Sequence, residues 1–170
     1  MKYKYYGVEA ERYHQYLLNN YSHLPIPELW SKKVIIELDI GWCYKKKCFT
    51  FPHYDKDGLI INVHFHKGFS IGDGSCKWYP VHFVARYDTS KPLFITEGEK
   101  DCVSYLSKNK QALCSTLGAL NIPQDLSPLE PFKEIIILYD NDEAGINGAL
   151  KLAESIKSTY PNKIVKVVKW

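Results

Sequence analysis

The sequence predicts an α/β domain with a parallel sheet flanked by helices over residues 91–170, preceded by a small mixed α+β basic subdomain over residues 1–90. After Pro92, short apolar segments alternate with segments of helical composition, which is the order expected of a parallel sheet with helices on both faces. Before Asp88, aromatic and β-branched runs surround turn residues, as in antiparallel hairpins. The change falls at Asp88–Pro92, where we place the domain boundary.

The first 90 residues begin with helical segments and continue with short strands. Val8–Asn20 has helical composition, and the two prolines of Leu24–Pro27 end it. Ser31 is placed to cap a second, shorter helix that ends by Gly41.

A hairpin follows these helices. The β-rich runs Cys48–Phe51 and Leu59–Phe65 flank Asp55–Gly58, which has the composition of a turn. We therefore expect a small antiparallel sheet within residues 42–87. The glycine-rich stretch Gly68–Gly74 has loop composition and lacks the spacing of a phosphate-binding loop.

The second half has the clearer periodicity. The segment Ile135–Tyr139 is apolar on both faces, as a central parallel strand should be, and an apolar stripe at helical spacing runs through Ala149, Leu152 and Ile156. The expected strands are Leu93–Thr96, Ala112–Cys114, Glu134–Tyr139 and 163–169, and the expected helices are 99–107 and 142–158.

Composition excludes several classes of protein. Of the 170 residues, 45% are hydrophobic and 24% are charged, which is typical of a folded chain rather than a disordered one. No apolar run approaches the roughly 20 residues that span a bilayer, and no secretory signal precedes the first helix, so we expect a cytoplasmic protein without membrane contact. The five cysteines, an odd number, favour free thiols.

The positive charge is concentrated in the first half. Residues 1–90 carry 12 Lys and Arg against 9 Asp and Glu, together with all six His and ten of the thirteen Tyr. A basic surface rich in aromatic residues suits phosphates and unstacked bases. Composition alone equally fits ordinary solvated lysines. The cysteines and histidines of this half, among them Cys43, Cys48, His64 and His66, lack the spacing of a zinc site, so zinc is not expected.

Acidic residues follow two of the apolar strands. Glu97-Gly98 comes directly after Leu93–Thr96, and Asp140-Asn141-Asp142 comes directly after Tyr139. If these strands are neighbours, Glu97, Asp140 and Asp142 meet at the carboxyl edge of the sheet, where open α/β sheets bind ligands. Clustered carboxylates repel one another unless a hard cation such as Mg²⁺ or Mn²⁺ binds them. Taken singly, Asp140 or Asn141 could instead cap the following helix.

These residues carry a resemblance to a known family. Glu97-Gly98-Glu99-Lys100-Asp101, a later glycine in Ser115-Thr-Leu-Gly118, and Asp140-Asn-Asp142-Glu-Ala-Gly145 resemble the signature motifs of the Toprim domain. The first half is similar to the region that precedes Toprim in DNA primases of the DnaG and phage primase-helicase type, through Phe49-Thr-Phe-Pro-His-Tyr-Asp-Lys-Asp-Gly58 and a lysine placed like Lys77.

The resemblance implies the catalytic core of a DNA primase, which makes RNA primers on a single-stranded DNA template from ribonucleoside triphosphates. It implies that Glu97, Asp140 and Asp142 are catalytic residues that hold Mg²⁺ or Mn²⁺. It also implies a replicative helicase, or a fused helicase domain, as partner. The supporting residues implied are Gly98, Asp101, Gly118 and Gly145. The residues expected to bind nucleic acid or nucleotide are Lys77 first, then Lys47, Lys67, Arg86 and Trp78, with Lys45 and Lys46 as lesser candidates.

One position departs from the family pattern, because His66 stands where an arginine is common near the end of the strand after the Asp-Gly turn. Two other functions fit the same motifs. A Toprim nuclease would direct water at a phosphodiester from the same carboxylates and metal. A non-catalytic nucleic-acid-binding module of a replication assembly would bind DNA without turnover.

Overall fold

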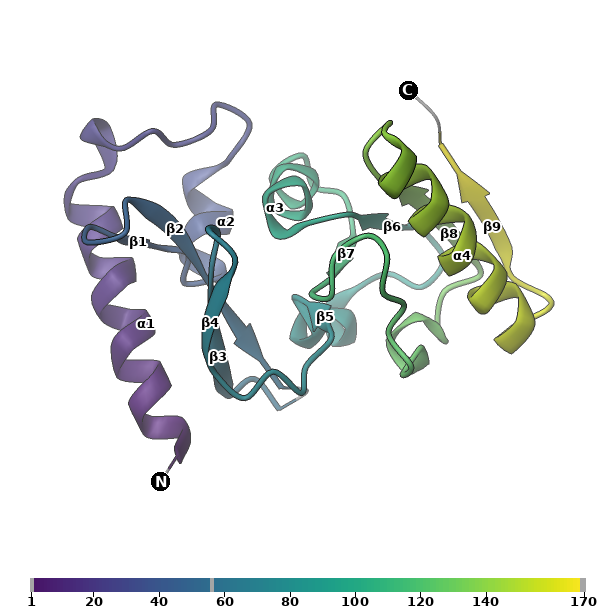
Figure 1. The fold of residues 1–170 in the computed structure, drawn as a ribbon, viewed down its shortest axis with the longest axis horizontal. Coiled ribbons are helices and arrows are strands. Elements are labelled where there is room, and N and C mark those ends of the chain that lie inside the picture. The colour runs from purple at the N-terminus through teal and green to yellow at the C-terminus, as the bar shows by residue number, and fades with distance from the viewer. Residues whose placement is uncertain (1, 56, 169–170) are drawn as a thin grey trace. The chain divides into compact units, whose positions relative to one another are not determined.

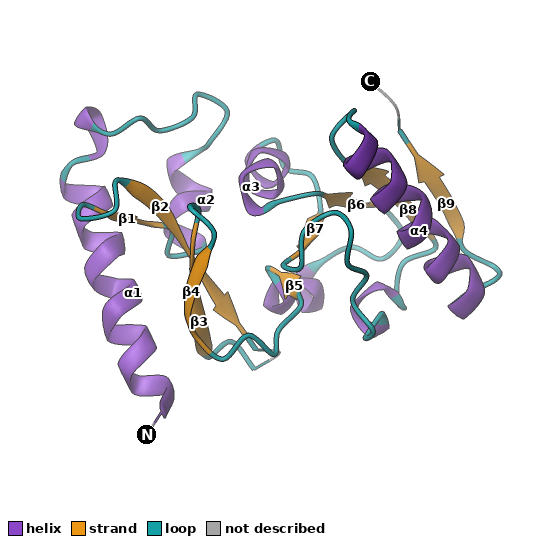
Figure 2. Ribbon diagram, in the orientation of Figure 1, coloured by secondary structure: helices purple, strands orange, loops and turns teal. Residues whose placement is uncertain are grey.

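The computed structural model describes residues 2–55 and 57–168 and divides the chain into two compact units, Met1–Cys76 and Lys77–Trp170. Figure 1 labels the elements, and Figure 2 distinguishes helices from strands. The first unit has an antiparallel sheet with helices, and the second has a largely parallel sheet with helices on both faces. An α/β domain preceded by a small α+β region is therefore confirmed.

The first unit begins with helix α1 (Lys2–Asn19), which starts six residues before the expected segment. A short 3₁₀ turn, η1 (Tyr21–His23), and an extended proline-containing segment lead to α2 (Lys32–Glu37). Ser31 is the N-cap of α2, since its Oγ accepts a hydrogen bond from the backbone N–H of Val34 at 3.2 Å.

Four antiparallel strands follow in the spatial order β1-β2-β3-β4. They are β1 (Gly41–Cys43), β2 (Cys48–Tyr54), β3 (Ile60–Phe65) and β4 (Phe69–Gly72). The prediction of a loop over Gly68–Gly74 is wrong for β4, which pairs with β3 from Phe65↔Phe69 to Asn62↔Gly72. Gly72 has φ +126°, and a Cβ there would lie 2.5 Å from the carbonyl oxygen of Ile61. Glycine at this position therefore allows the backbones of β4 and β3 to lie close together.

Helix α1 packs on one face of this sheet. The buried cluster between them contains Ala10 and Tyr13 from α1 and Val63 and Phe65 from β3, together with the thiols of Cys43 and Cys48. The rings of Tyr13 and Phe65 meet edge to face at a centroid distance of 5.5 Å. A Cβ at Gly41 would lie 2.6 Å from Tyr13, so glycine lets β1 approach the helix.

The second unit is built on a five-stranded sheet in the order β5-β7-β6-β8-β9. Its strands are β5 (Trp78–Tyr79), β6 (Leu93–Thr96), β7 (Ala112–Ser115), β8 (Glu134–Leu138) and β9 (Ile164–Val167). Strands β6 to β9 are parallel, as predicted, whereas β5 pairs antiparallel with β7. The sheet is therefore mixed.

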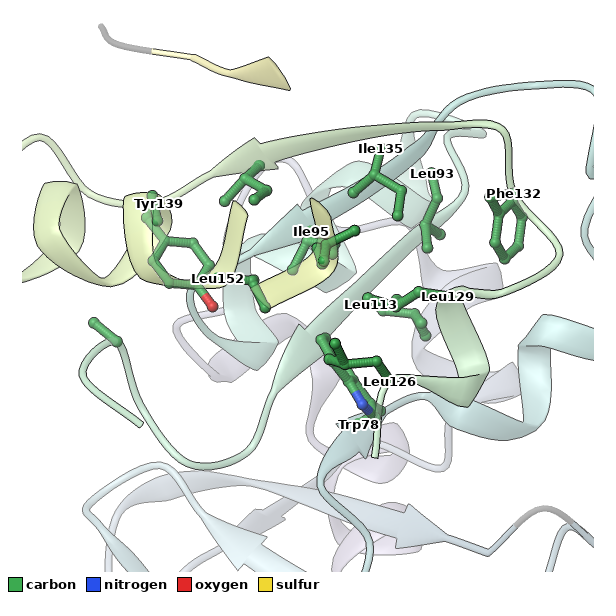
Figure 3. Close-up of a cluster of buried hydrophobic side chains, with 14 residues drawn as sticks. Trp78, Leu93, Ile95, Leu113, Leu126, Leu129, Phe132, Ile135, Tyr139 and Leu152 are labelled. Carbon is green, nitrogen blue, oxygen red and sulfur yellow. The ribbon is translucent and has the colours of Figure 1, made fainter. Parts of the chain in front are cut away.

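Helices cover both faces of this sheet. The ring of Phe94 on β6 contacts Tyr105 of α3 (Glu99–Ser107) at 5.3 Å. Its neighbour Ile95 points to the other face and shares a buried cluster with Leu152 of α4 (Glu143–Thr159). Figure 3 shows this cluster between α4, the sheet and the loop before β8, which includes the 3₁₀ turn η3 (Ser127–Leu129). Phe94 and Ile95 lie on opposite faces of the sheet because successive side chains of a strand alternate between its two faces.

The strand order reverses in the middle of the sheet. From β6 the chain crosses by α3 to β7 on one side, and from β8 it crosses by α4 to β9 on the other side. Strands β6 and β8 are adjacent and in register from Leu93↔Ile135 to Thr96↔Leu138. Their carboxyl ends form the topological switch point, where open α/β sheets bind ligands.

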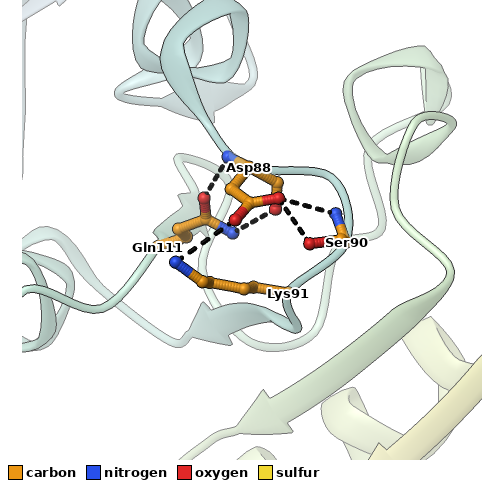
Figure 4. A network of polar contacts seen from close by, with 4 residues as sticks. All are labelled: Asp88, Ser90, Lys91 and Gln111. Atoms are coloured by element: carbon orange, nitrogen blue, oxygen red, sulfur yellow. Dashed lines mark hydrogen bonds and ion pairs between the residues drawn. The ribbon is translucent and has the colours of Figure 1, made fainter.

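The units divide between Cys76 and Lys77, earlier than the boundary expected at residues 88–92. The reason is that Trp78 pairs with β7 and lies in the second core, 2% exposed. The 3₁₀ helix η2 (Val81–Arg86) follows β5, and Figure 4 shows how the next segment is anchored to β7. The side-chain amide of Gln111 accepts a hydrogen bond from the backbone N–H of Asp88 and donates one to its carbonyl oxygen. The Asp88 carboxylate also accepts a hydrogen bond from Ser90 Oγ and forms an ion pair with Lys91. This segment is a fixed turn of the second unit rather than a linker.

A buried lysine closes the opposite end of the sheet. Lys163, just before β9, donates from Nζ to the carbonyl oxygens of Glu130 and Phe132, each at 2.6 Å, and lies over the ring of Tyr160 at 4.7 Å. Composition predicts a surface lysine at this position, so sequence reasoning missed it. Among the described residues, none of the helices is both long and apolar enough to cross a membrane.

Candidate metal and catalytic site

Glu97 lies at the centre of the candidate site. It directly follows β6, the middle strand, and its Oε2 accepts a hydrogen bond from the backbone N–H of Asp140 at 3.0 Å. Asp140 comes two residues after β8. This contact joins two segments 43 residues apart in sequence and confirms that the two acidic motifs meet at one edge of the sheet.

The N-terminus of α4 supplies the third carboxylate. Asp142 is the N-cap, and its Oδ1 accepts a hydrogen bond from the backbone N–H of Gly145 at 2.7 Å. Asp140 and Asn141 lie before the cap and are exposed. The alternative in which Asp140 or Asn141 caps the helix is therefore wrong, because Asp142 is the cap. The cap bond uses Oδ1 of Asp142, so its Oδ2 is the oxygen that would bind a metal ion.

Gly145 lets the two acidic segments come this close. A Cβ at this position would lie 2.2 Å from the carbonyl oxygen of Asp140 and 2.9 Å from Oε2 of Glu97. Glycine, which has no Cβ, allows this close approach. Gly98 differs, since its φ is −137° and a Cβ there would meet nothing within 4 Å, so the protein itself does not require glycine at that position.

A second glycine of α4 holds the loop after β7. A Cβ at Gly148 would lie 2.1 Å from the carbonyl oxygen of Ala119. Within that loop, Ser115 Oγ accepts from the N–H of Leu117 at 3.2 Å, and Gly118 has φ +76°, a conformation that favours glycine. Because β7 is next to β6, this loop borders the edge at which Glu97 lies. The family resemblance implies a supporting role for Gly118 but gives no signal for Gly148.

The surroundings of Glu97 make its carboxylate costly to ionise. The pKa of Glu97 lies above its ordinary value, first because burial disfavours the charged form, and further because of the negative charges of Asp140, Asp142 and Asp101. The hydrogen bond from Asp140 N–H opposes this shift only partly. Asp101, exposed in the first turn of α3, therefore acts electrostatically on Glu97.

The donor set fits a hard divalent cation. Glu97, Asp140 and Asp142 offer only oxygen atoms, and the two aspartates are exposed to solvent at the sheet edge. Mg²⁺ and Mn²⁺ take carboxylate oxygens and keep water or phosphate at their other positions. A cation here would offset the repulsion that adds to the effect of burial on the Glu97 pKa.

The five residues expected to bind nucleic acid do not share one location in the chain. Lys47 and Lys67 are exposed in turns of the first unit. Lys77 directly precedes β5, and its carbonyl oxygen accepts from Thr116 N–H at 3.0 Å. Arg86 is exposed at the end of η2, with its guanidinium carbon 3.7 Å from the ring centre of Phe83.

Trp78 does not fit the expectation of base stacking. Its indole is 2% exposed, packs in the core seen in Figure 3, and donates from Nε1 to the carbonyl oxygen of Asp125 at 2.7 Å. Its ring therefore belongs to the interior of the second unit and has no exposed face for a base.

Comparison with known proteins agrees with this geometry. Residues 94–169 match a family described as Toprim-like. Most of the second unit therefore has a Toprim-like fold. The match covers the strands and helices that build the carboxylate site, from within β6 to the end of β9. No curated protein sequence matches the chain.

Solved primase structures are similar in fold over 82–100% of this chain. The Escherichia coli primase catalytic core is similar with a TM-score of 0.79 and 15% identity, over 100% of this chain and 72% of that one. A DnaG primase catalytic domain bound to single-stranded DNA is similar with a TM-score of 0.73 and 15% identity, over 99% of this chain and 72% of that one. The primase fragment of the bacteriophage T7 primase-helicase is similar with a TM-score of 0.60 and 18% identity, over 82% of this chain and 60% of that one. The chain thus spans about three fifths of the T7 fragment.

The charge on Glu97 provides a test of the site. Glu97→Gln keeps an oxygen that can accept the Asp140 N–H bond but removes the negative charge. Because the pKa of Glu97 is raised in the folded state, its ionised form lowers the free energy of unfolding at pH values above that pKa. This destabilisation disappears as the pH falls through the raised pKa toward the ordinary value of 4.5. Without divalent metal, the variant should unfold at a higher urea concentration than the wild type at pH 7, and the gap should narrow toward pH 4.

The control for this measurement is Glu154→Gln, an exposed carboxylate on α4. It should leave the difference in urea midpoint near zero at both pH values. A Glu97→Gln protein that is less stable than the wild type at pH 7 would show that Glu97 stabilises the fold, which contradicts an uncompensated carboxylate cluster.

Proposed function

We propose that this chain is the catalytic core of a DNA primase, a nucleotidyltransferase that synthesises RNA primers on single-stranded DNA with Mg²⁺ or Mn²⁺. The observation that carries the proposal is the meeting of Glu97 with Asp140 and Asp142 at the switch point of a Toprim-like sheet. The fold shared with primase catalytic cores supports the class of reaction.

In this proposal Glu97, Asp140 and Asp142 hold the metal ion, and Asp101 adds negative charge beside them. When bound, the metal neutralises charge on the triphosphate and favours deprotonation of the attacking hydroxyl. The protein positions these carboxylates through the Asp142 cap and the close approach at Gly145. Positioning the reacting groups accounts for much of the catalysis in phosphoryl transfer.

We assign template and nucleotide binding to basic side chains, with Lys77 and Arg86 in the second unit and Lys47 and Lys67 in the first. A similar DnaG catalytic domain is described as bound to single-stranded DNA, which supports DNA as the template. A similar T7 fragment comes from a primase-helicase protein, which supports a helicase as partner or fused domain. Such a protein would act on DNA in the cytoplasm.

The test is a reaction with end-labelled single-stranded DNA, ribonucleoside triphosphates and Mg²⁺ or Mn²⁺. We expect new RNA oligomers that require template, triphosphates and metal together. Shortened DNA that forms without triphosphates would show a nuclease instead. DNA binding without any metal-dependent product, under conditions where the E. coli primase core makes primers, would show a non-catalytic module. Either of these outcomes rejects the proposal.

A further inference from the structure

The hydroxyl group of Thr96 lies at the end of the central strand, directly before Glu97. Thr96 is the last residue of β6, and its backbone pairs with Cys114 of β7 on one side and with Leu138 of β8 on the other. The residue is completely buried. The sheet therefore fixes the main chain as far as Thr96, and Glu97 is the first residue beyond the strand.

The buried hydroxyl forms a hydrogen bond that encloses Glu97. Thr96 Oγ1 donates to the carbonyl oxygen of Gly98 at 3.1 Å. The same oxygen accepts the first hydrogen bond of α3, from the backbone N–H of Cys102 at 3.1 Å. A carbonyl oxygen has two lone pairs, and both are used here. The main chain is thus fixed on both sides of Glu97, by the strand pairing before it and by two hydrogen bonds after it.

The side chains of β6 alternate between the two faces of the sheet. Phe94 faces α3 and Ile95 faces α4, so we expect Thr96 on the α3 face and Glu97 on the α4 face. The contacts agree with this expectation. Thr96 bonds to the residue at which α3 begins, whereas Oε2 of Glu97 accepts the backbone N–H of Asp140, shortly before α4. A hydrogen bond that encloses Glu97 restricts its backbone and therefore the direction of its carboxylate.

The two acidic segments are held in different ways. The start of α4 is fixed by the side chain of Asp142, which caps that helix. Within residues 2–55 and 57–168, no side chain caps α3 at Gly98. The Thr96 hydroxyl instead fixes Gly98 through its carbonyl oxygen. Because Glu97 is the residue enclosed by this bond, loss of the hydroxyl would loosen Glu97 first.

We propose that Thr96 is a positioning residue, whose hydroxyl bond to Gly98 holds the Glu97 carboxylate against Asp140 and so prepares it to bind a metal ion. The positioning of Glu97 rests on the contacts of Thr96 itself, whereas its consequence for metal binding rests on the proposed function. Groups that orient a metal ligand affect metal affinity although they do not touch the ion. From the sequence, Thr96 is only the last residue of an expected strand.

The test compares variants with and without the hydroxyl. Thr96→Val removes the hydroxyl but keeps the branched shape, and Thr96→Ser keeps the hydroxyl. Thr159→Val is the matched control, because Thr159 Oγ1 also donates to a carbonyl oxygen, that of Ser155 at 2.9 Å, at the far end of α4. If Thr96→Val does not fold, Thr96→Ala replaces it and is compared with Thr96→Ser, from which it differs by the hydroxyl alone.

The first measurement needs neither metal nor triphosphates. It records the chemical shift of the Asp140 amide proton by NMR at neutral pH in EDTA, because a hydrogen bond to a carboxylate moves such a proton downfield. Glu97→Ala, which removes the acceptor, defines the shift of the unbonded state. Thr96→Val should move the proton at least about half of the way to that state, since a misaligned hydrogen bond weakens steeply. Thr96→Ser and the Thr159 control should keep the wild-type shift.

The second measurement is a titration with Mn²⁺, followed by electron paramagnetic resonance. Thr96→Val should bind Mn²⁺ about tenfold more weakly than the wild type, as expected when a group that orients a metal ligand is lost. Thr96→Ser and Thr159→Val should bind as the wild type does. A structural role without positioning would lower the urea midpoint of Thr96→Val but leave the Asp140 proton and the Mn²⁺ affinity unchanged.

Each outcome decides for or against the proposal. It is overturned if Thr96→Val keeps the wild-type shift of the Asp140 proton, or if the wild type binds Mn²⁺ and this variant binds it equally well. It is also overturned if Thr96→Ser is as impaired as Thr96→Val, or if the Thr159 control changes as much. A wild type that binds no Mn²⁺ and makes no primers would count against the proposed function, and the Asp140 proton would then decide on Thr96. Primer synthesis by the wild type, with an unchanged Asp140 proton in Thr96→Val, would reject the role of Thr96 alone.

Discussion

Asp140→Asn should reduce metal-dependent primer synthesis on the order of 10³-fold, equivalent to about 4 kcal/mol of transition-state stabilisation. Asparagine has nearly the same size but lacks the negative charge that a divalent cation requires. The backbone N–H of residue 140 is unchanged, so the hydrogen bond to Glu97 remains and the fold should persist. The effect should therefore be one of metal binding and catalysis rather than of folding.

Two measurements separate these effects. Titration with Mn²⁺, followed by electron paramagnetic resonance, should show weaker binding in Asp140→Asn than in the wild type, while the urea midpoint measured in EDTA should not fall. Glu154→Gln, which removes one exposed carboxylate of α4, should leave both activity and Mn²⁺ binding intact. Full primer synthesis by Asp140→Asn would exclude Asp140 from the metal site.

The parallel strands and the carboxylates at their ends could be predicted from the sequence. Ile135–Tyr139 is apolar on both faces, as a central strand covered by helices is. Parallel strands that alternate with helices place their carboxyl ends at one edge of a sheet. The adjacency of β6 and β8 and the reversal of strand order between them then bring Glu97 to Asp140.

Other features depend on contacts that leave no local pattern. Strand β5 has two residues, too few for periodicity, and it exists because Trp78 and Tyr79 pair with β7. Trp78 was expected among the residues that bind nucleic acid, but it fills the second core. Lys163 is buried because its ammonium group donates hydrogen bonds to two carbonyl oxygens. No pattern in the flanking sequence predicts that arrangement.

The glycines of α4 provide the second large effect. In Gly145→Ala the new methyl group would be 2.2 Å from the carbonyl oxygen of Asp140, and backbone atoms cannot yield without moving the start of the helix or the acidic segment. We expect activity to fall about 100-fold or more and the free energy of unfolding to drop by about 1–3 kcal/mol. Activity assays and urea unfolding of the same preparations measure both.

The comparison with two other glycines makes this prediction specific. Gly98→Ala adds a methyl group that meets nothing within 4 Å, so it should keep near wild-type stability although it lies beside Glu97 in sequence. In Gly148→Ala the new methyl group would press on the backbone of Ala119, so the free energy of unfolding should drop about as much as in Gly145→Ala. Mn²⁺ binding should be weakened less, because the loop after β7 moves rather than the carboxylates. If Gly145→Ala bound Mn²⁺ and made primers as the wild type does, the close approach of Asp140 to α4 would have no role in positioning the site.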